Sequence, residues 1–167
     1  MSWTIREERT GDEEAIRSVV DAAFEGLPYS DGDEADMIDR LRRDGDLLLS
    51  LVAVEDGEVI GQVAYSAAGL SNGEEGWMVV GPIAVSPAHQ GKGIGRALME
   101  AGEAAMRERG AKGITVFGDP ALYGRFGYRQ YTPMTQAGEL GEYLQVKSFG
   151  AEIPAAEIRY APGFGFD

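Results

Sequence analysis

The feature that most constrains the fold of this chain is a glycine-rich run that leads into its most regular helical segment. The run HQGKGIGRALME, residues 89–100, places Gly91, Gly93 and Gly95 at alternate positions. Glycine is about 1 kcal/mol less favourable than alanine in a helix, so its density here needs a reason. Unpaired N–H groups at a helix N-terminus carry partial positive charge. Either the run is a flexible turn, or its bare backbone holds an anion.

The distribution of charge favours the anion. The formal net charge of the 167 residues is −13, which argues against nucleic acid as a partner because a phosphate backbone requires a basic face. Residues 90–130 nevertheless hold seven lysines and arginines against four acidic residues, and Lys92 and Arg96 lie in the run itself. The acidic remainder serves general solubility or salt adaptation, or it attracts a cationic substrate.

Composition narrows the other classes. The chain has no cysteine, so disulfides, thiolate metal sites and a cysteine nucleophile are excluded, and we predict no metal. No apolar run approaches the roughly 20 residues that span a bilayer, so no membrane association is expected. The N-terminal residues are charged and lack the apolar centre of a signal peptide, which predicts a cytoplasmic protein.

Hydrophobic periodicity predicts one α/β (α+β) domain over residues 1–167. Asp56-Gly57 joins two apolar runs and indicates a hairpin. Gly81-Pro82 lies inside a long strand, where proline removes a donor and should break or bulge the ladder. The expected strands are 3–9, the two arms of a hairpin over 46–69, 74–87, 113–118 (buried), 127–132 and 142–149. The expected helices are 10–24, 34–45, 92–109 and 119–126, and the tail 158–167 should pack on the surface.

Two nucleotide-binding patterns fit the run poorly. A P-loop needs Gly-Lys-Ser/Thr after a four-residue spacer, and no such sequence occurs. A Rossmann fingerprint has the spacing G-x-G-x-x-G after the first strand, whereas this run reads G-x-G-x-G after the fourth.

The stretch GPIAVSPAHQGKGIGRAL instead closely resembles the acyl-CoA motif of the GCN5-related N-acetyltransferase (GNAT) superfamily. Val85, Pro87, Gln90, Gly93 and Gly95 stand at the expected spacing. GDPALYGRFGYR is similar to the second motif of the family, a short helix followed by Tyr-x-x-x-Gly-Phe/Tyr. Together with the closing RYAPGF, these motifs resemble the YhbS-like branch most closely. The resemblance covers essentially the whole chain.

The resemblance implies a fold and a donor. The fold is a single-domain GNAT fold with a mixed sheet of six to seven strands, splayed between the fourth and fifth strands, and helices on both faces. Acetyl-CoA would be the co-substrate, with pantetheine in the splay against the backbone of Ile83, Ala84 and Val85. Gln90 would order the loop. The backbone from Gly91 to Arg96 would hold the pyrophosphate, through Gly91, Lys92, Gly93, Ile94, Gly95 and Arg96.

The resemblance also implies catalytic roles. Tyr123, with a phenol pKa near 10, would return a proton to the departing thiolate. Glu75, or its neighbour Glu74, is the candidate for the residue that takes the proton of the amine, although a solvated surface carboxylate is the alternative. Glu25, Tyr29 and Glu34 are the candidates for acceptor binding. His89 is interpreted as a turn residue.

These observations favour an acyl-CoA-dependent N-acetyltransferase that transfers acetyl from acetyl-CoA to a primary amine by direct attack. The acceptor is a small molecule or an amine of a peptide or protein. A non-catalytic acyl-CoA-binding sensor or regulatory module is the alternative, and a nucleotide-binding domain is a third. Exposed edge strands leave a homodimer open.

Overall fold

The backbone forms a six-stranded sheet in the order β1-β2-β3-β5-β6-β8, in a computed structural model that describes residues 2–28, 30–131, 133–136 and 143–165. Neighbouring strands are antiparallel, except that β5 and β6 are parallel. The strands are β1 (Thr4–Glu7), β2 (Leu47–Glu55), β3 (Glu58–Ala67), β5 (Trp77–Val85), β6 (Gly113–Phe117) and β8 (Leu144–Ser148). A smaller sheet joins β4 (Gly69–Leu70), β9 (Glu157–Arg159) and β7 (Thr135–Gln136).

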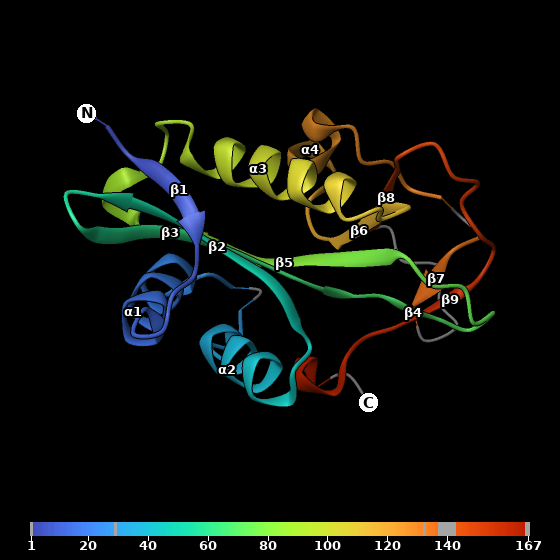
Figure 1. Cartoon of the computed structure of the whole chain (residues 1–167), viewed down its shortest axis with the longest axis horizontal. Helices are drawn as coiled ribbons and strands as arrows, with labels where there is room; N and C mark the ends of the chain where they lie inside the picture. Colours follow the sequence, from blue (N-terminus) through green and yellow to red (C-terminus); the bar gives the residue numbers. More distant parts are fainter. Residues whose placement is uncertain (1, 29, 132, 137–142, 166–167) are drawn as a thin grey trace.

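Helices cover both faces of the large sheet (Figure 1). Helices α1 (Glu13–Phe24) and α2 (Glu34–Asp44) lie on one face, and α3 (Ile94–Glu108) and α4 (Pro120–Tyr123) on the other. Short 3-10 turns are η1 (Pro87–His89), η2 (Gly124–Phe126) and η3 (Pro162–Phe164). On the α3 side, Leu98 and Met106 pack against the sheet, and on the opposite side Ile16, Val20 and Ile38 do so. The mixed sheet and its two helical layers confirm the predicted fold class.

Local chemistry explains where several elements begin and end. Asp56 and Gly57 both have positive φ, as a two-residue type I′ hairpin requires, so the predicted hairpin is confirmed. Gly45 takes a left-handed conformation and ends α2. Helix α3 begins at Ile94, two residues later than predicted, because Gly93 has a φ of 85° and stands outside the helix as its N-cap.

Three sequence-based expectations were wrong. Arg129 makes only an isolated bridge to Val146, so residues 127–131 are not the predicted strand, and residue 132 lies outside the described part. The tail does not simply pack on the surface, because Ile158 and Phe164 are buried in a core cluster with Leu41. The strand over 113–118 is not buried throughout: its last residue, Phe117, is half exposed. Each case depends on long-range packing, which periodicity does not encode.

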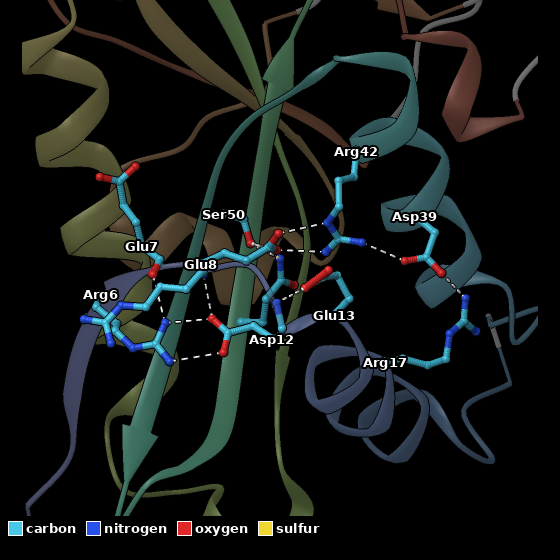
Figure 2. A network of polar contacts seen from close by, with 12 residues as sticks. Arg6, Glu7, Glu8, Asp12, Glu13, Arg17, Asp39, Arg42 and Ser50 are labelled. Atoms are coloured by element: carbon cyan, nitrogen blue, oxygen red, sulfur yellow. Dashed lines mark hydrogen bonds and ion pairs between the residues drawn. The ribbon is translucent and has the colours of Figure 1, made fainter.

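A network of ion pairs fastens α1 and α2 to the first strands (Figure 2). Arg42 of α2 donates to both carboxylate oxygens of Glu8, at 2.8 and 2.9 Å, and Ser50 of β2 donates to the same carboxylate. Asp39 accepts from Arg42 and from Arg17 of α1. Isolated surface ion pairs contribute little, but shared, partly buried carboxylates make a network. The network therefore fixes both helices, and the ends of the loop between them, relative to the sheet.

Two absences concern the described residues alone. Among the helices they form, none is long and apolar enough to cross a bilayer. Within the same ranges, His, Asp and Glu side chains form no group of three arranged to hold a metal ion.

We predict that Gly102→Ala destabilises the protein. Gly102 lies inside α3, where alanine would normally be favoured by about 1 kcal/mol. A Cβ at this position would overlap the hydroxyl oxygen of the buried Tyr65. Overpacking of this kind typically costs about 1–3 kcal/mol, so urea denaturation should show a net loss of stability. Gly95→Ala is the matched control, because its Cβ would meet only a Val85 methyl group at 3.8 Å. A stabilised Gly102→Ala variant would contradict the packing.

We predict that Asp12→Asn weakens the dependence of stability on acid. A hydrogen bond from Arg6, at 2.7 Å, holds the pKa of the Asp12 carboxyl below its usual range. Such a group stabilises the fold above the pKa of an unfolded Asp, about 3.9, and loses that contribution as pH falls through its folded value. The difference in free energy of unfolding between wild type and variant should be constant from about pH 7 to about pH 5 and shrink below about pH 4. A difference that persists unchanged at about pH 2 argues against this role.

Candidate functional site

The centre of the candidate site is the point where β5 separates from β6. The parallel pairing runs from Trp77 opposite Gly113 to Val80 opposite Val116, and stops there. On its other edge β5 stays paired to β3 as far as Val85, across a bulge at Gly81-Pro82. The predicted break in the ladder and the predicted splay are therefore both present. Between residues 81 and 85, one edge of β5 has no strand partner among the described residues.

The three strand residues predicted to meet pantetheine lie on this unpaired stretch. Ile83 and Val85 pack toward the α3 side, while Ala84 packs toward α1. On β3, Val63 pairs with Ile83, Gln62 with Ala84 and Gly61 with Val85. The carbonyl oxygen of Val85 is already occupied, because the amide Nε2 of Gln90 donates to it at 3.0 Å. Gln90 thus ties the loop to the end of β5.

The glycine-rich loop leads from this strand end into α3. Gly91 and Gly93 have φ of 79° and 85°, the left-handed region that favours glycine, and a Cβ at either would meet no atom within 4 Å. Helix α3 has no side-chain cap and no acidic residue in its first turn. By contrast, acidic residues occupy the first turns of α1 and α2. The N-terminus of α3 therefore presents bare N–H groups to solvent, a geometry that suits a phosphate group.

Two cationic side chains, Arg96 and Lys92, lie near the loop. The guanidinium of Arg96 lies 5.1 Å from the centre of the Phe126 ring and 3.7 Å from the Glu100 carboxylate. Lys92 lies exposed in the loop, directly before Gly93. Its charge and that of Arg96 both stand within one turn of the α3 N-terminus.

Tyr123 stands beside the splay. It ends α4, and its ring packs so closely on Gly118 that a Cβ there would lie 2.5 Å from Tyr123 Cε2. Gly118 follows directly after β6, two residues beyond Val116, the last residue paired to β5. The Tyr123 ring also meets that of Tyr128 edge to face, with 6.2 Å between centroids. Asp119 caps α4 by accepting from the Ala121 N–H at 2.9 Å, which fixes the short helix to the strand end.

The structure does not bring Glu75 to Tyr123. Glu75 is exposed in the loop before β5, at the end of the strand that is still paired to β6. The parallel register places it about seven residues, or roughly 20 Å along the strand direction, from the level of Gly118. Its neighbour Glu74 accepts from Trp77 Nε1 at 2.6 Å and pairs with Lys112 at 3.5 Å. The Trp77 hydrogen bond lowers the pKa of Glu74, which makes it a weaker base.

The residues predicted to bind the acceptor lie around a different hollow. Glu25 and Glu34 line an open cavity of about 690 Å³ between the C-terminal end of α1 and the start of α2. Asp21, Asp31 and Arg17 also line it, so four of its five charged lining residues are acidic. Both carboxylate oxygens of Glu34 are within 2.8 Å of the Ser30 hydroxyl. The third predicted residue, Tyr29, lies outside the described residues.

Two contacts near the site were not predicted from the sequence. His89, which ends η1 as the predicted turn residue, places Nε2 3.4 Å from Glu55 Oε1 at the end of β2 and so links the loop to the hairpin. Phe117 and Tyr143 form an exposed edge-to-face pair at the end of β6. The contact between His89 and Glu55 could not be predicted, because it depends on how the hairpin lies relative to the loop. The only signal for Phe117 was a large aromatic residue directly before the glycine that ends a strand.

Comparison with known proteins adds evidence from outside the chain. Residues 13–128 match the family model described as Acetyltransferase (GNAT) family. The Escherichia coli K12 protein YhbS, described as an uncharacterized N-acetyltransferase, is 41% identical over 96 residues. That match covers 57% of this chain and 58% of YhbS, so the chain spans less than two thirds of that relative. YjhQ of the same strain, described in the same terms, is 29% identical over 99 residues, 57% of this chain and 55% of YjhQ.

Two solved structures are similar over nearly the whole chain. A GNAT family acetyltransferase from Brucella melitensis in complex with acetyl-CoA has 39% identity, a TM-score of 0.88 and 98% coverage of both chains. YhbS from Escherichia coli in complex with CoA has 31% identity and a TM-score of 0.86, with 98% of this chain and 92% of that chain covered. The splayed sheet, the glycine-rich loop and the family model agree, and the chain belongs to the GNAT acetyltransferase family.

Proposed function

We propose that this protein is an N-acetyltransferase that moves an acetyl group from acetyl-CoA to a primary amine by direct attack. One observation carries the proposal: β5 has no β6 partner beyond Val80, and the glycine-rich loop that follows it leads to a helix N-terminus without a side-chain cap. An extended amide-containing ligand can pair with such a strand edge, and its phosphates can reach the helix N–H groups. The similar structures that hold acetyl-CoA or CoA support the same donor.

The residues present fit coenzyme A. The space beside Gly91 and Gly93 is open, so phosphate oxygens can approach the backbone without meeting a Cβ. Lys92 and Arg96 add full positive charge beside the N–H groups, in a chain whose net charge is −13. Bound there, the donor would supply an activated acetyl thioester at the vertex of the splay.

Tyr123 is the residue we assign to proton return. Its ring stands against Gly118, level with the first unpaired residues of β5, so its phenol is the proton donor beside the vertex. A phenol stays protonated at neutral pH and can give its proton to the sulfur that leaves as thiolate. Glu75 stays a prediction as the base, and its distance along β5 would require a chain of water. We therefore propose that the amine loses its proton to water.

The acidic hollow supports an amine as acceptor. Glu25, Asp21 and Asp31 border the space between α1 and α2, and a field of this sign raises the local concentration of ammonium ions. The carboxylates attract the cation, whereas the nitrogen that attacks must first be neutral. The hollow thus contributes to encounter with the acceptor and not to the chemical step.

The overall proposal is tested by two measurements on the purified chain. Calorimetric titration with CoA measures donor binding, and thiol release from acetyl-CoA with a panel of primary amines measures transfer. Binding with amine-dependent thiol release is the expected result. Binding without release across the panel would favour the sensor, and protection from heat by ATP or NAD but not by CoA would favour a nucleotide-binding domain.

We predict that Gly93→Asp weakens CoA binding by about two orders of magnitude, because it adds a negative charge where the pyrophosphate would sit. The left-handed φ of Gly93 also disfavours any side chain. Gly73→Asp is the matched control: Gly73 has a φ of 80°, with equally open space, in a loop before β5. Equal CoA affinity for both variants, measured by calorimetry, would refute the assignment of the loop.

We predict that Tyr123→Phe lowers kcat about 10²-fold while leaving the CoA dissociation constant near that of the wild type. Tyr128→Phe is the control, since the buried Tyr128 hydroxyl has no hydrogen-bond partner among the described residues. Burial raises the pKa of Tyr128, which makes it a poorer proton donor. If both variants lose activity equally, or neither does, Tyr123 is not the donor.

A further inference from the structure

Exposed apolar side chains gather at the vertex of the splay. Among the described residues, four large apolar side chains are exposed: Leu48 at 42%, Phe117 at 51%, Leu122 at 44% and Tyr143 at 47%. Three of them surround the C-terminal end of β6. Phe117 ends the strand, Leu122 lies in α4, and Tyr143 directly precedes β8, the antiparallel neighbour of β6. The rings of Phe117 and Tyr143 are in contact and so form a continuous exposed apolar surface, the kind that marks a binding site.

Strand alternation places Phe117 on the face opposite to Tyr123. Ile114 and Val116 of β6 point into the core beneath α3. Because side chains alternate along a strand, Phe117 points to the other face. At the next residue, Gly118, the direction returns to the α3 side, and the ring of Tyr123 packs there. The Tyr123 phenol and the Phe117 side chain therefore stand on opposite sides of the same strand end, and the Tyr143 ring contacts that of Phe117.

Phe117 is the last residue of β6, and a backbone hydrogen bond ties Tyr143 to the residue after it. The N–H of Gly118 donates to the carbonyl of Tyr143 at 2.9 Å. Gln145, only 2% exposed, donates from its amide to the carbonyl of Gly118 at 3.0 Å. The rings of Phe117 and Tyr143 meet at 63° with 5.9 Å between centroids. The two rings together present an apolar surface whose backbone supports are fixed to the sheet, an arrangement that suits selective recognition.

The proposed acetyl transfer assigns this wall an occupant. The donor would approach along the α3 face, because the glycine-rich loop opens α3. The amine must then reach the thioester from the opposite face. There, the side chain of β6 nearest to the splay is that of Phe117, the last residue of the strand. We propose, on the basis of the proposed function, that Phe117 and Tyr143 form one wall of the acceptor site and select primary monoamines with an aromatic or branched aliphatic group near the nitrogen.

The chemistry of the wall explains the preference. Aromatic edges and faces attract apolar and aromatic groups and exclude water from them. Neither ring carries a carboxylate, so a second ammonium group in the acceptor finds no ion-pair partner in this wall. The acidic hollow attracts the single ammonium group during approach, and the rings then hold the apolar part of the molecule.

The test compares amines and variants in the same thiol-release assay on the full chain. The probes are 2-phenylethylamine, isopentylamine, methylamine and spermidine. We expect kcat/KM for the first two to exceed that for the last two by at least about tenfold, the discrimination that a small apolar pocket provides. Phe117→Ala and Tyr143→Ala should each lower kcat/KM for the apolar amines about tenfold, with methylamine and CoA affinity unchanged.

Leu48→Ala is the control, because Leu48 is similarly exposed but lies near Arg109 and the α3 C-terminus. Phe117→Leu should retain most of the preference, and circular dichroism checks that each variant folds. Equal rates for all amines, unaffected by Phe117→Ala, overturn the aromatic wall and leave acetyl transfer standing. No release from any amine despite CoA binding overturns both. Conversion of a dimer to a monomer by Phe117→Ala, seen by light scattering, would make this face an interface between copies and also overturn the proposal.

Discussion

The structure depends on one limit in strand pairing: β5 is bonded on both edges only as far as Val80. Up to that residue it is an ordinary central strand. Beyond it, the bulge at Gly81-Pro82 shifts the register with β3 by one residue, and β5 stays paired to β3 after its pairing to β6 has ended. This divergence positions the glycine-rich loop and Tyr123, because the loop follows the end of β5 and Tyr123 follows the end of β6.

Much of this could be predicted because the signals are local. A proline inside a strand removes a donor, Asp-Gly closes a hairpin, and glycines before a regular helix leave its N–H groups bare. Each of these depends on a few neighbouring residues, and the resemblance of motifs to a known family ordered them in space. The positions of the glycine-rich loop and of Tyr123 relative to the splay followed from the same information.

The remaining features arise from contacts between distant residues. Glu75 seemed adjacent to the site because it precedes the same strand, but a strand of nine residues separates its two ends by roughly 30 Å. Phe117 belongs to an apolar strand, and only the placement of β8 shows that its side chain remains exposed. Likewise, the space at Gly102 is filled by Tyr65 from another part of the chain, which no pattern within the helix reveals.

The burial of Phe164 against Leu41 has a consequence for the order in which the protein can complete its fold. The strands β1, β2 and β3 are neighbours in both sequence and space, so their pairing is available as soon as they are synthesised. The cluster beneath α2, however, combines Leu41 with Val146 and Phe164 and closes contacts more than a hundred residues apart. Until the ribosome has released those later residues, Leu41 at the end of α2 lacks the partners that bury it in the folded chain. The packing of this end of α2 therefore has to wait for the C-terminal residues, whereas the pairing of β1, β2 and β3 does not.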